Sequence, residues 1–183
     1  MPVETESKAA ELYERFRQGD KAAFESLVLE YRHSLALFIR RFVSDMDTAE
    51  DLAADVFVKL LVKKPRYKGN ASFKTWLFTA GRNLAVDHLR KHGRTLTEEE
   101  VRQGHSEGTE DSFFKSERKR ALYRALNTLP RDEKQLMHLI YIEDLGYDHA
   151  EKVLGVPKGK LYAMARRAKG TLKDILTKEG IEF

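Results

Sequence analysis

The sequence predicts an all-α protein made of two small helical domains joined by a flexible linker. Apolar residues recur with the three- and four-residue spacing of amphipathic helices through most of the chain. No stretch has the sustained alternation of a strand. Between residues 95 and 117 the helical spacing is lost in a polar, acidic segment that is longer than a usual helix connection. We therefore place the first domain at 1–94, the linker at 95–117 and the second domain at 118–183.

The first domain contains three predicted helices. The first begins after Gly19 and Asp20. The second is capped by Asp47, with Glu50 as its capping-box partner, and ends before Pro65. Apolar side chains mark the buried face of each helix: Phe24, Leu27, Val28, Tyr31, Leu35, Phe38 and Phe42 in the first, and Leu52, Val56, Phe57 and Leu60 in the second.

The third helix is capped by Ser72, stops near Gly93 and carries two kinds of surface. Its buried stripe contains the only tryptophan of the chain, and comprises Phe73, Trp76, Leu77, Ala80 and Leu84, with Phe78, Ala85 and Leu89 beside it. The remaining strip comprises Thr75, Thr79, Arg82, Asn83, Val86 and Arg90. Its polar groups can donate to phosphates and base edges. A solvated face explains them equally well, because cations near a helix C-terminus also complement its dipole.

The second domain is predicted to contain a helix-turn-helix. Helical spacing returns through Leu122, Leu126 and Leu129, and again through Leu136, Leu139 and Ile140. After Gly146 the pattern gives a short helix, a tight turn from Gly155 to Pro157 and a longer helix over about 158–176. The acidic linker before this domain includes Glu98, Glu99 and Glu100, which are interpreted as solvated charge.

Composition favours a soluble, cytoplasmic protein. The 183 residues include 42% hydrophobic residues and no cysteine, so disulfides and thiolate metal sites are excluded. We find neither a signal-peptide core nor the ~18 apolar residues of a membrane span, and expect no membrane contact. The 33 basic and 29 acidic residues give a net charge of +4, which alone does not predict nucleic-acid binding.

Nothing in the sequence predicts an enzyme, a cofactor or a metal site. No nucleophile motif, glycine-rich phosphate loop or metal-spaced acidic cluster is present. His88 and His92 lie four residues apart on one predicted helix, but no glutamate is adjacent, and Arg90 and Lys91 would repel a cation. We interpret them as surface histidines.

The order of short motifs is more specific than any one of them. The chain contains, in sequence, D-T-A-E-D-L-A-A-D-V-F, Y-K-G-N-A-S-F-K-T-W-L, A-G-R-N-L-A-V-D-H-L-R, the acidic linker, A-L-N-T-L-P and L-G-V-P-K-G-K-L-Y-A-M-A-R-R-A. Over about residues 19–178 this order resembles bacterial RNA polymerase sigma factors of the extracytoplasmic-function (ECF) group. The resemblance implies two helical domains, region 2 and region 4, that bind core RNA polymerase and promoter DNA to initiate transcription.

The resemblance also implies site residues. In region 2, the polymerase clamp is bound by Asp51, Leu52, Asp55, Phe57 and Lys59. The minus-ten element is bound by a base-capturing loop of Lys68, Gly69, Asn70, Ala71 and Ser72 and by Arg82, Asn83, Asp87 and Arg90. Unstacking a base costs a few kcal/mol, which the pocket and nearby charges must supply. Asp87 can instead orient Arg90 or Arg94. In region 4, the minus-thirty-five element is bound by Lys158, Lys160, Tyr162, Arg166 and Arg167. An anti-sigma factor is the implied regulatory partner.

Several residues depart from the family pattern. Members commonly have G-T-V-K-S-R-L-x-R-A where this chain has G-K-L-Y-A-M-A-R-R-A, so Ala163 and Met164 replace two DNA donors. Glu151 stands where a small residue is usual, and we expect it to pair with Arg167 or Lys160 or to face solvent. Ala54 replaces a frequent glutamine, which removes one possible polymerase contact. We therefore expect unusual minus-thirty-five specificity.

Two other functions remain open from the sequence. A stand-alone helix-turn-helix regulator would need only the second domain. A sigma-like polymerase adaptor that has lost promoter recognition would account for the departures at Glu151, Ala163 and Met164.

Overall fold

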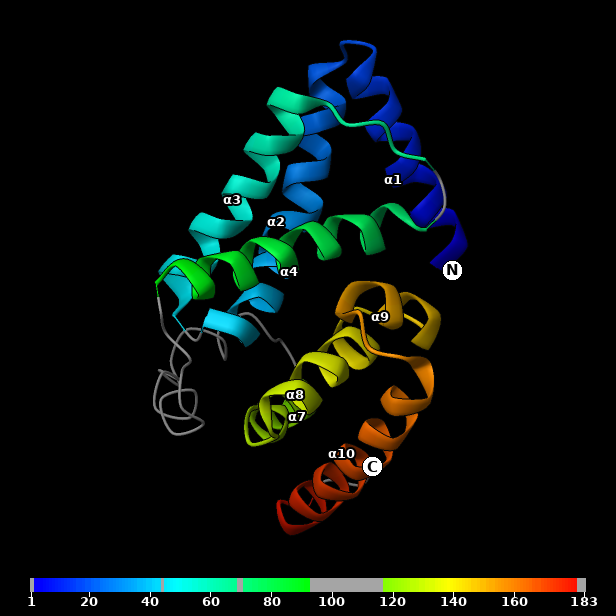
Figure 1. The fold of residues 1–183 in the computed structure, drawn as a ribbon. Coiled ribbons are helices and arrows are strands. Elements are labelled where there is room, and N and C mark those ends of the chain that lie inside the picture. Colours follow the sequence, from blue (N-terminus) through cyan, green and yellow to red (C-terminus); the bar gives the residue numbers. More distant parts are fainter. Residues whose placement is uncertain (1, 44, 69–70, 93–116, 181–183) are drawn as a thin grey trace.

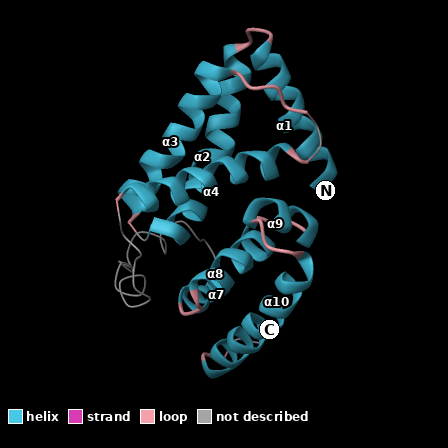
Figure 2. Cartoon of the chain, viewed as in Figure 1, coloured by secondary structure: helices cyan, strands magenta, loops and turns pink. Residues whose placement is uncertain are grey.

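The computed structural model describes residues 2–43, 45–68, 71–92 and 117–180, and these residues contain helices and short connections without a strand (Figures 1 and 2). The predicted all-α class is confirmed. The linker predicted at 95–117 lies outside the described residues except at its last position. Within the described part of the chain, no helix combines the length and hydropathy needed to cross a membrane.

The first domain consists of α1 (Pro2–Arg17), α2 (Lys21–Val43), α3 (Met46–Lys63) and α4 (Phe73–Lys91). The start predicted for α2 is confirmed, because the Ala23 N–H donates to Asp20 Oδ1 at 3.2 Å. Our sequence analysis missed α1, although its buried side chains follow helical spacing: Ala9, Leu12, Tyr13 and Phe16. The Tyr13 hydroxyl donates to the Pro65 carbonyl at 2.8 Å and joins α1 to the end of α3.

The cap of α3 differs from the prediction. Asp45, not Asp47, is the N-cap, and its side chain accepts a hydrogen bond from the Thr48 N–H at 2.8 Å. The reason is conformational: Asp45 has the extended backbone of an N-cap, with φ −99° and ψ 133°, whereas Asp47 already lies inside the first turn. The predicted buried face of α3 is confirmed at Leu52, Val56, Phe57 and Leu60.

Helix α4 crosses the domain over an aromatic core. Ser72 caps it as predicted, with the Thr75 N–H donating to Ser72 Oγ at 3.1 Å. Phe73 is fully buried among the rings of Tyr13, Tyr31, Tyr67 and Trp76. Farther along, α4 approaches α2 so closely that a Cβ on Gly81 would lie 2.7 Å from Leu35 Cδ1. Glycine therefore permits this helix crossing.

The second domain consists of α7 (Glu117–Asn127), α8 (Arg131–Met137), a π-helical turn η1 (His138–Ile142), α9 (Tyr147–Leu154) and α10 (Lys158–Lys178). The predicted helix-turn-helix is confirmed as α9, a turn and α10. Gly155 ends α9 in the left-handed region with φ 66°, a conformation that glycine adopts without steric cost. The buried face of α10 comprises Leu161, Met164, Ala165, Ala168, Leu172 and Leu176.

The two domains are in contact. Helix α9 packs against α4, and α8 packs against α2. Figure 1 shows α9 beside the N-terminal end of α4, with α10 extending away from the first domain. Polar side chains from both domains meet at this contact, where Lys74 Nζ of α4 lies 2.7 Å from Glu143 Oε2.

Candidate protein and nucleic-acid interfaces

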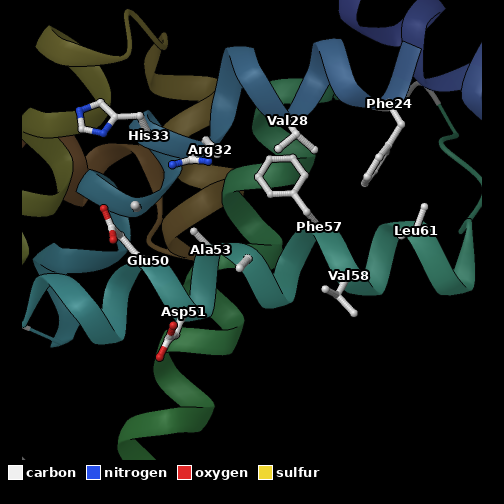
Figure 3. A pocket seen from close by; sticks show the side chains of 12 residues that line it. Phe24, Val28, Arg32, His33, Glu50, Asp51, Ala53, Phe57, Val58 and Leu61 are labelled. Carbon is white, nitrogen blue, oxygen red and sulfur yellow. The ribbon is translucent and has the colours of Figure 1, made fainter. Parts of the chain in front are cut away.

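A groove of about 470 Å³ lies between α2 and α3 (Figure 3). Its apolar lining includes Phe24 and Val28 from α2 and Phe57, Val58 and Leu61 from α3. Glu50 and Asp51 line it nearer the start of α3, and Arg32 and His33 line it from α2. The groove thus combines an apolar floor with charged groups at one end, which is the chemistry of a site for a partner helix.

The structure distributes the predicted polymerase-binding residues over different surfaces. Asp51 is exposed in this groove, and Asp55 is exposed beside it. Leu52 is buried in the core, and Phe57 is largely buried while forming part of the groove wall. Lys59 is exposed on the other side of α3, where it lines a second groove. These five residues therefore do not form one continuous exposed surface.

Four exposed apolar residues were missed by the sequence analysis: Leu29, Val58, Leu61 and Val62. Val58 and Leu61 are 54% and 47% exposed and both line the first groove. The sequence does contain a signal for them. From residue 56 to 62 the chain reads V-F-V-K-L-L-V, which holds more apolar side chains than one face of a helix can bury.

The second groove, of about 320 Å³, lies between α3 and α4. It is lined by Lys59 and Lys63 from α3 and by Trp76, Asn83 and Asp87 from α4. Two predicted DNA-binding residues, Asn83 and Asp87, therefore share one groove with two lysines and an aromatic ring. Ammonium groups, an amide and an aromatic ring are the groups that hold single-stranded nucleic acid.

The remaining predicted residues of α4 are tied to their neighbours. Arg82 donates to Asn83 Oδ1 at 3.3 Å, and Arg90 lies 3.7 Å from Asp87 Oδ1. Asp87 thus pairs with Arg90, one of the two alternatives expected from the sequence. Arg90 and Asp87 are both well exposed, so the pair is open to an incoming ligand.

Only part of the predicted base-capturing loop is described. Gly69 and Asn70 lie outside the described residues. Lys68 is exposed, and the Tyr67 hydroxyl donates to the Ala71 carbonyl. Ser72 is buried, and its hydroxyl lies 2.8 Å from that of Thr75 as well as capping α4. Ser72 is therefore occupied in shaping the end of the loop.

The start of the α4 polar strip is covered. Thr75 is 1% exposed, and its hydroxyl lies 2.8 Å from His149 Nδ1 of α9. The Thr79 hydroxyl donates to the Thr75 carbonyl within the same helix. The strip predicted from the sequence is thus open near Asn83 and Arg90 but closed by the second domain near Thr75.

Glu151 of α9 accepts a hydrogen bond from α10 that was not predicted from the sequence. Its Oε1 accepts the backbone N–H of Lys158, the first residue of α10, at 3.1 Å. The predicted pairing with Arg167 is wrong, because the Arg167 side chain instead donates to Glu133 at 3.0 Å. Glu151 is also only partly exposed, so it does not simply face solvent. The turn places the first amide of α10 within hydrogen-bond distance of Glu151, and a carboxylate also complements the positive end of the helix dipole.

The predicted minus-thirty-five residues share α10 but differ in their pairing. Lys160 and Arg166 are exposed, and Tyr162 is half-exposed with its ring centroid 4.4 Å from that of Tyr147. Lys158 Nζ lies 2.5 Å from Asp148 Oδ1. This hydrogen bond raises the pKa of Lys158 and lowers the pKa of Asp148.

Met164 is part of the core of the second domain. It is buried on the inner face of α10, whereas Ala163 is exposed. Of the two predicted replacements of a DNA donor, Ala163 therefore lies on the exposed face of α10, whereas Met164 fills the core.

The two histidines that were considered as metal ligands lie at the surface of α4. The rings of His88 and His92 stack with centroids 4.1 Å apart. Partial burial lowers the pKa of His88, and the neighbouring His92 contributes in the same direction.

Comparison with known proteins defines the class of this two-domain helical protein. Two family models match: Sigma-70 region 2 over residues 27–95 and Sigma-70 region 4 over residues 119–172. RNA polymerase sigma-H factor of Pseudomonas aeruginosa is 30% identical over 184 residues, which cover 94% of this chain and 95% of that protein. ECF RNA polymerase sigma-E factor of Haemophilus influenzae is 28% identical over 175 residues, 89% of this chain and 92% of that protein.

Solved structures show the same fold. The sigma factor RpoE from Bartonella quintana, solved with the anti-sigma factor NepR, gives a TM-score of 0.62 at 26% identity and covers 84% of this chain and 96% of its own. CnrH, solved with the cytosolic domain of CnrY, gives a TM-score of 0.63 at 21% identity. That match covers 93% of this chain and 98% of the CnrH chain. The chain belongs to the ECF group of RNA polymerase sigma factors, a family of transcription initiation factors.

Proposed function

We propose that this sigma factor binds core RNA polymerase through the groove between α2 and α3, and promoter DNA through α4 and α10. The groove is the observation that carries the proposal. Val58 and Leu61 keep about half of their surface in contact with water, and Asp51 lies in the same groove. Burying these apolar side chains against a partner is favourable by about 25 cal/mol per Å². A DNA-binding regulator that acts alone would have no use for such a surface.

Within this proposal, the predicted clamp residues have two roles. Asp51 and Asp55 contact the polymerase directly from exposed positions. Leu52 and Phe57 act from inside the domain, where they fix the position of α3. We assign Lys59 to the DNA side, because it lines the groove shared with Asn83.

The minus-ten element is bound, in our proposal, along the groove between α3 and α4 and at the loop that precedes α4. Lys59, Lys63 and Lys68 attract the strand's phosphates. Asn83 and Arg90 contact bases and backbone from α4. Gly69, Asn70 and Ala71 form the predicted capture loop, and Ser72 fixes its end by capping α4.

The minus-thirty-five element is bound by α10 in the major groove. Lys160, Tyr162 and Arg166 are exposed and contact the DNA directly. Lys158 and Arg167 are paired with Asp148 and Glu133 in the free chain, and they release these carboxylates to bind phosphate groups of the DNA. We further propose that an anti-sigma factor holds the protein inactive, as the NepR complex of RpoE illustrates for a relative. The protein acts in the cytoplasm, catalyses no reaction itself and needs no cofactor.

The two other functions have less support than the sigma-factor function. The adaptor hypothesis rested on Glu151, Ala163 and Met164. Glu151 caps α10 and Met164 fills the core, so these two residues have structural reasons for being there, whereas Ala163 is exposed. The stand-alone regulator leaves the α2–α3 groove unexplained.

Leu61→Asp tests the polymerase surface. We expect a loss of core polymerase binding of at least about tenfold, because a carboxylate would be desolvated in an apolar contact. The matched control is Val62→Asp, one residue along the same helix and 74% exposed but outside the groove. Both variants should fold alike. Binding to core polymerase by size-exclusion chromatography, followed by transcription from a promoter library, measures the effect. Equal binding by the two variants would exclude this groove as the polymerase site.

The DNA surface is tested in the same transcription assay. Combined replacement of Arg82, Asn83 and Arg90 by alanine should impair promoter opening while core polymerase binding persists. If promoter opening and core polymerase binding were lost together, α4 would not act in DNA binding alone.

A further inference from the structure

Two histidine side chains lie against each other at the end of α4. His88 and His92 are four residues apart, and their rings stack with centroids 4.1 Å apart and planes inclined by 28°. Residues at this spacing share one face of a helix. His88 is partly buried and His92 is exposed, so solvent reaches the pair. The fold therefore brings two imidazole rings together at one place on the surface of the first domain.

A hydrogen bond to the backbone fixes the position of the proton on one of the rings. His92 Nδ1 lies 2.9 Å from the His88 carbonyl oxygen, which can only accept, so Nδ1 carries the hydrogen when the ring is neutral. The free lone pair is then on Nε2. Histidines that bind metal ions are oriented in the same way, because they donate their other ring N–H to a carbonyl or carboxylate. His92 is therefore prepared to act as a metal ligand through Nε2.

The two rings are close enough to bind one ion. Metal–nitrogen bonds of about 2.0–2.1 Å place two neighbouring nitrogen ligands about 2.9–3.4 Å apart. Rings with centroids 4.1 Å apart can reach that separation by small rotations of their side chains. Two histidines at this spacing also bind zinc in the H-E-x-x-H motif, where the glutamate is the general base and not a ligand. The lack of an adjacent glutamate in this chain therefore does not count against metal binding.

Neighbouring cations leave the pair open to a metal ion. Arg90 lies two residues from each histidine, which places it about 200° around the helix from His88. Its guanidinium also lies 3.7 Å from Asp87 Oδ1, which offsets its charge. Lys91 is exposed, so water and salt screen its ammonium group. The fold therefore removes most of the repulsion that the sequence alone suggests.

The ligand atoms select a class of ion. Imidazole nitrogen suits copper, nickel and zinc, and affinity at such sites is highest for Cu²⁺. Mg²⁺ and Ca²⁺ prefer oxygen ligands. Within the described residues, no third histidine or carboxylate joins the pair. Two protein ligands leave the other coordination positions to water or to an incoming donor, so the ion is exchangeable.

We propose that His88 and His92 form a binding site for a divalent transition-metal ion, with Cu²⁺ bound more tightly than Zn²⁺. The ion joins two residues one turn apart and so holds the last turn of α4 closed. The site is independent of the proposed function, but its consequence rests on that function. Arg90, which we assign to promoter DNA, lies in the same turn, and the ion adds positive charge near it. The ion is a ligand that modulates α4 and not a cofactor that initiation requires.

Copper titration of the full chain tests the site. The chain has no cysteine, so no thiolate competes for the ion. The parent chain should bind one Cu²⁺ more tightly than any further ion, and its electron paramagnetic resonance spectrum should show coupling to two imidazole nitrogens. His92→Asn should weaken this binding at least about tenfold, because the second of two linked ligands is lost. The spectrum of this variant should lose one nitrogen coupling.

The matched control moves the second imidazole without removing it. Arg90→His combined with His92→Asn keeps six histidines in the chain but places the two rings on opposite sides of α4. The change also removes a cation, which by itself would favour a metal ion, so weaker binding reports on geometry. All variants should be equally helical by circular dichroism. Tight copper binding by either variant, or coupling to a single nitrogen in the parent chain, overturns the proposal.

Zinc supplies a second readout at the backbone. The His92 N–H donates to the His88 carbonyl at 3.1 Å, and this bond breaks when the last turn opens. Zn²⁺ at about 100 times its dissociation constant should slow hydrogen exchange of that amide by up to about hundredfold in the parent chain. Exchange at the same position in His92→Asn should not change. Exchange that zinc leaves unchanged in the parent chain would contradict the closing of α4 by the ion.

Transcription separates the site from the proposed function. Zn²⁺ should increase promoter opening by the parent chain at least about twofold relative to His92→Asn, because added positive charge attracts phosphates. Metal binding and slower exchange without this increase would count against the proposed DNA surface of α4 and not against the metal site. An equal increase with both chains would show that zinc acts elsewhere and would overturn the effect of this site on transcription.

Discussion

The groove between α2 and α3 in the first domain and the outer face of α10 in the second differ in how their side chains are satisfied. In the groove, Val58 and Leu61 are exposed apolar groups that need a partner to leave water. On α10, Lys158 and Arg167 already pair with carboxylates of their own domain. In the proposed function, a protein partner gains from burying the groove, whereas DNA contacts Lys160 and Arg166 directly and gains from Lys158 and Arg167 only by replacing their ion pairs.

The cores of the domains differ as well. The first is organised around aromatic rings, with Phe73 at their centre, and the second around small and branched side chains under α10. The difference teaches that the first domain depends on a few large side chains, whereas the second depends on caps and turns that align short helices. Three changes test this, in decreasing order of expected effect.

Phe73→Ala should have the largest effect. Removing a fully buried phenyl ring leaves a cavity among four aromatic neighbours and should lower the free energy of unfolding by about 3–5 kcal/mol. Chemical unfolding followed by the fluorescence of Trp76, the only tryptophan, reports on the first domain. Val62→Ala, at an exposed site of the same domain, should change stability by no more than about 0.5 kcal/mol. Similar midpoints for the two variants would show that the ring cluster is not central.

Glu151→Ala should have an intermediate effect, confined to the second domain. The Lys158 N–H loses its side-chain acceptor, and loss of such a cap costs about 0.5–2 kcal/mol. Glu151→Gln retains an acceptor and should cost less. Amide hydrogen exchange at Lys158, together with thermal unfolding by circular dichroism, measures both. If Gln and Ala are equally harmful, the capping hydrogen bond is not the cause.

Asp45→Ala should have the smallest effect, and the effect should depend on pH. The hydrogen bonds from the Thr48 hydroxyl and N–H hold the pKa of Asp45 below its ordinary value. The folded pKa is thus lower than the unfolded one, near 3.9. The stabilisation is fully present above that pH and is lost as pH falls through the folded pKa. At pH 7 the variant should lose about 1 kcal/mol, and the difference from the parent should shrink below pH 4.

The control for this change is Asp47→Ala, the cap that the sequence favoured. Thermal unfolding from pH 3 to 7 compares the variants. A larger loss for Asp47→Ala than for Asp45→Ala would contradict the observed cap.

Much of the architecture could be predicted from local patterns. The buried face of α3, the Ser72 cap and the turn at Gly155 depend on nearest neighbours along the chain, and each was located correctly. The α1 helix was not predicted, although its buried residues Ala9, Leu12, Tyr13 and Phe16 have helical spacing. The predicted cap of α3 lies two residues from the observed one. Asp45 and Asp47 are both aspartates, and residue type alone makes either one a suitable N-cap.

The candidate site could be predicted less completely. Leu52, Phe57 and Ser72 were selected by motif position, and motif position does not distinguish a contact residue from the residue that supports it. The roles of Glu151 and Met164 also depend on which atoms the fold places opposite them. The assignment of individual residues to polymerase or DNA stays a prediction that the variants above can test.

The sequence by itself determined most of the helices, their order and the family, because helical periodicity, caps and motif order are local properties of the chain. Only the tertiary structure decided that Thr75 is covered by α9 and that Lys74, Glu143, His138 and Arg41 meet. Lys74 and Glu143 are 69 residues apart in the chain. Their pairing follows from the packing of α9 on α4, since a charge selects its partner by distance in space and has no periodic signature in sequence.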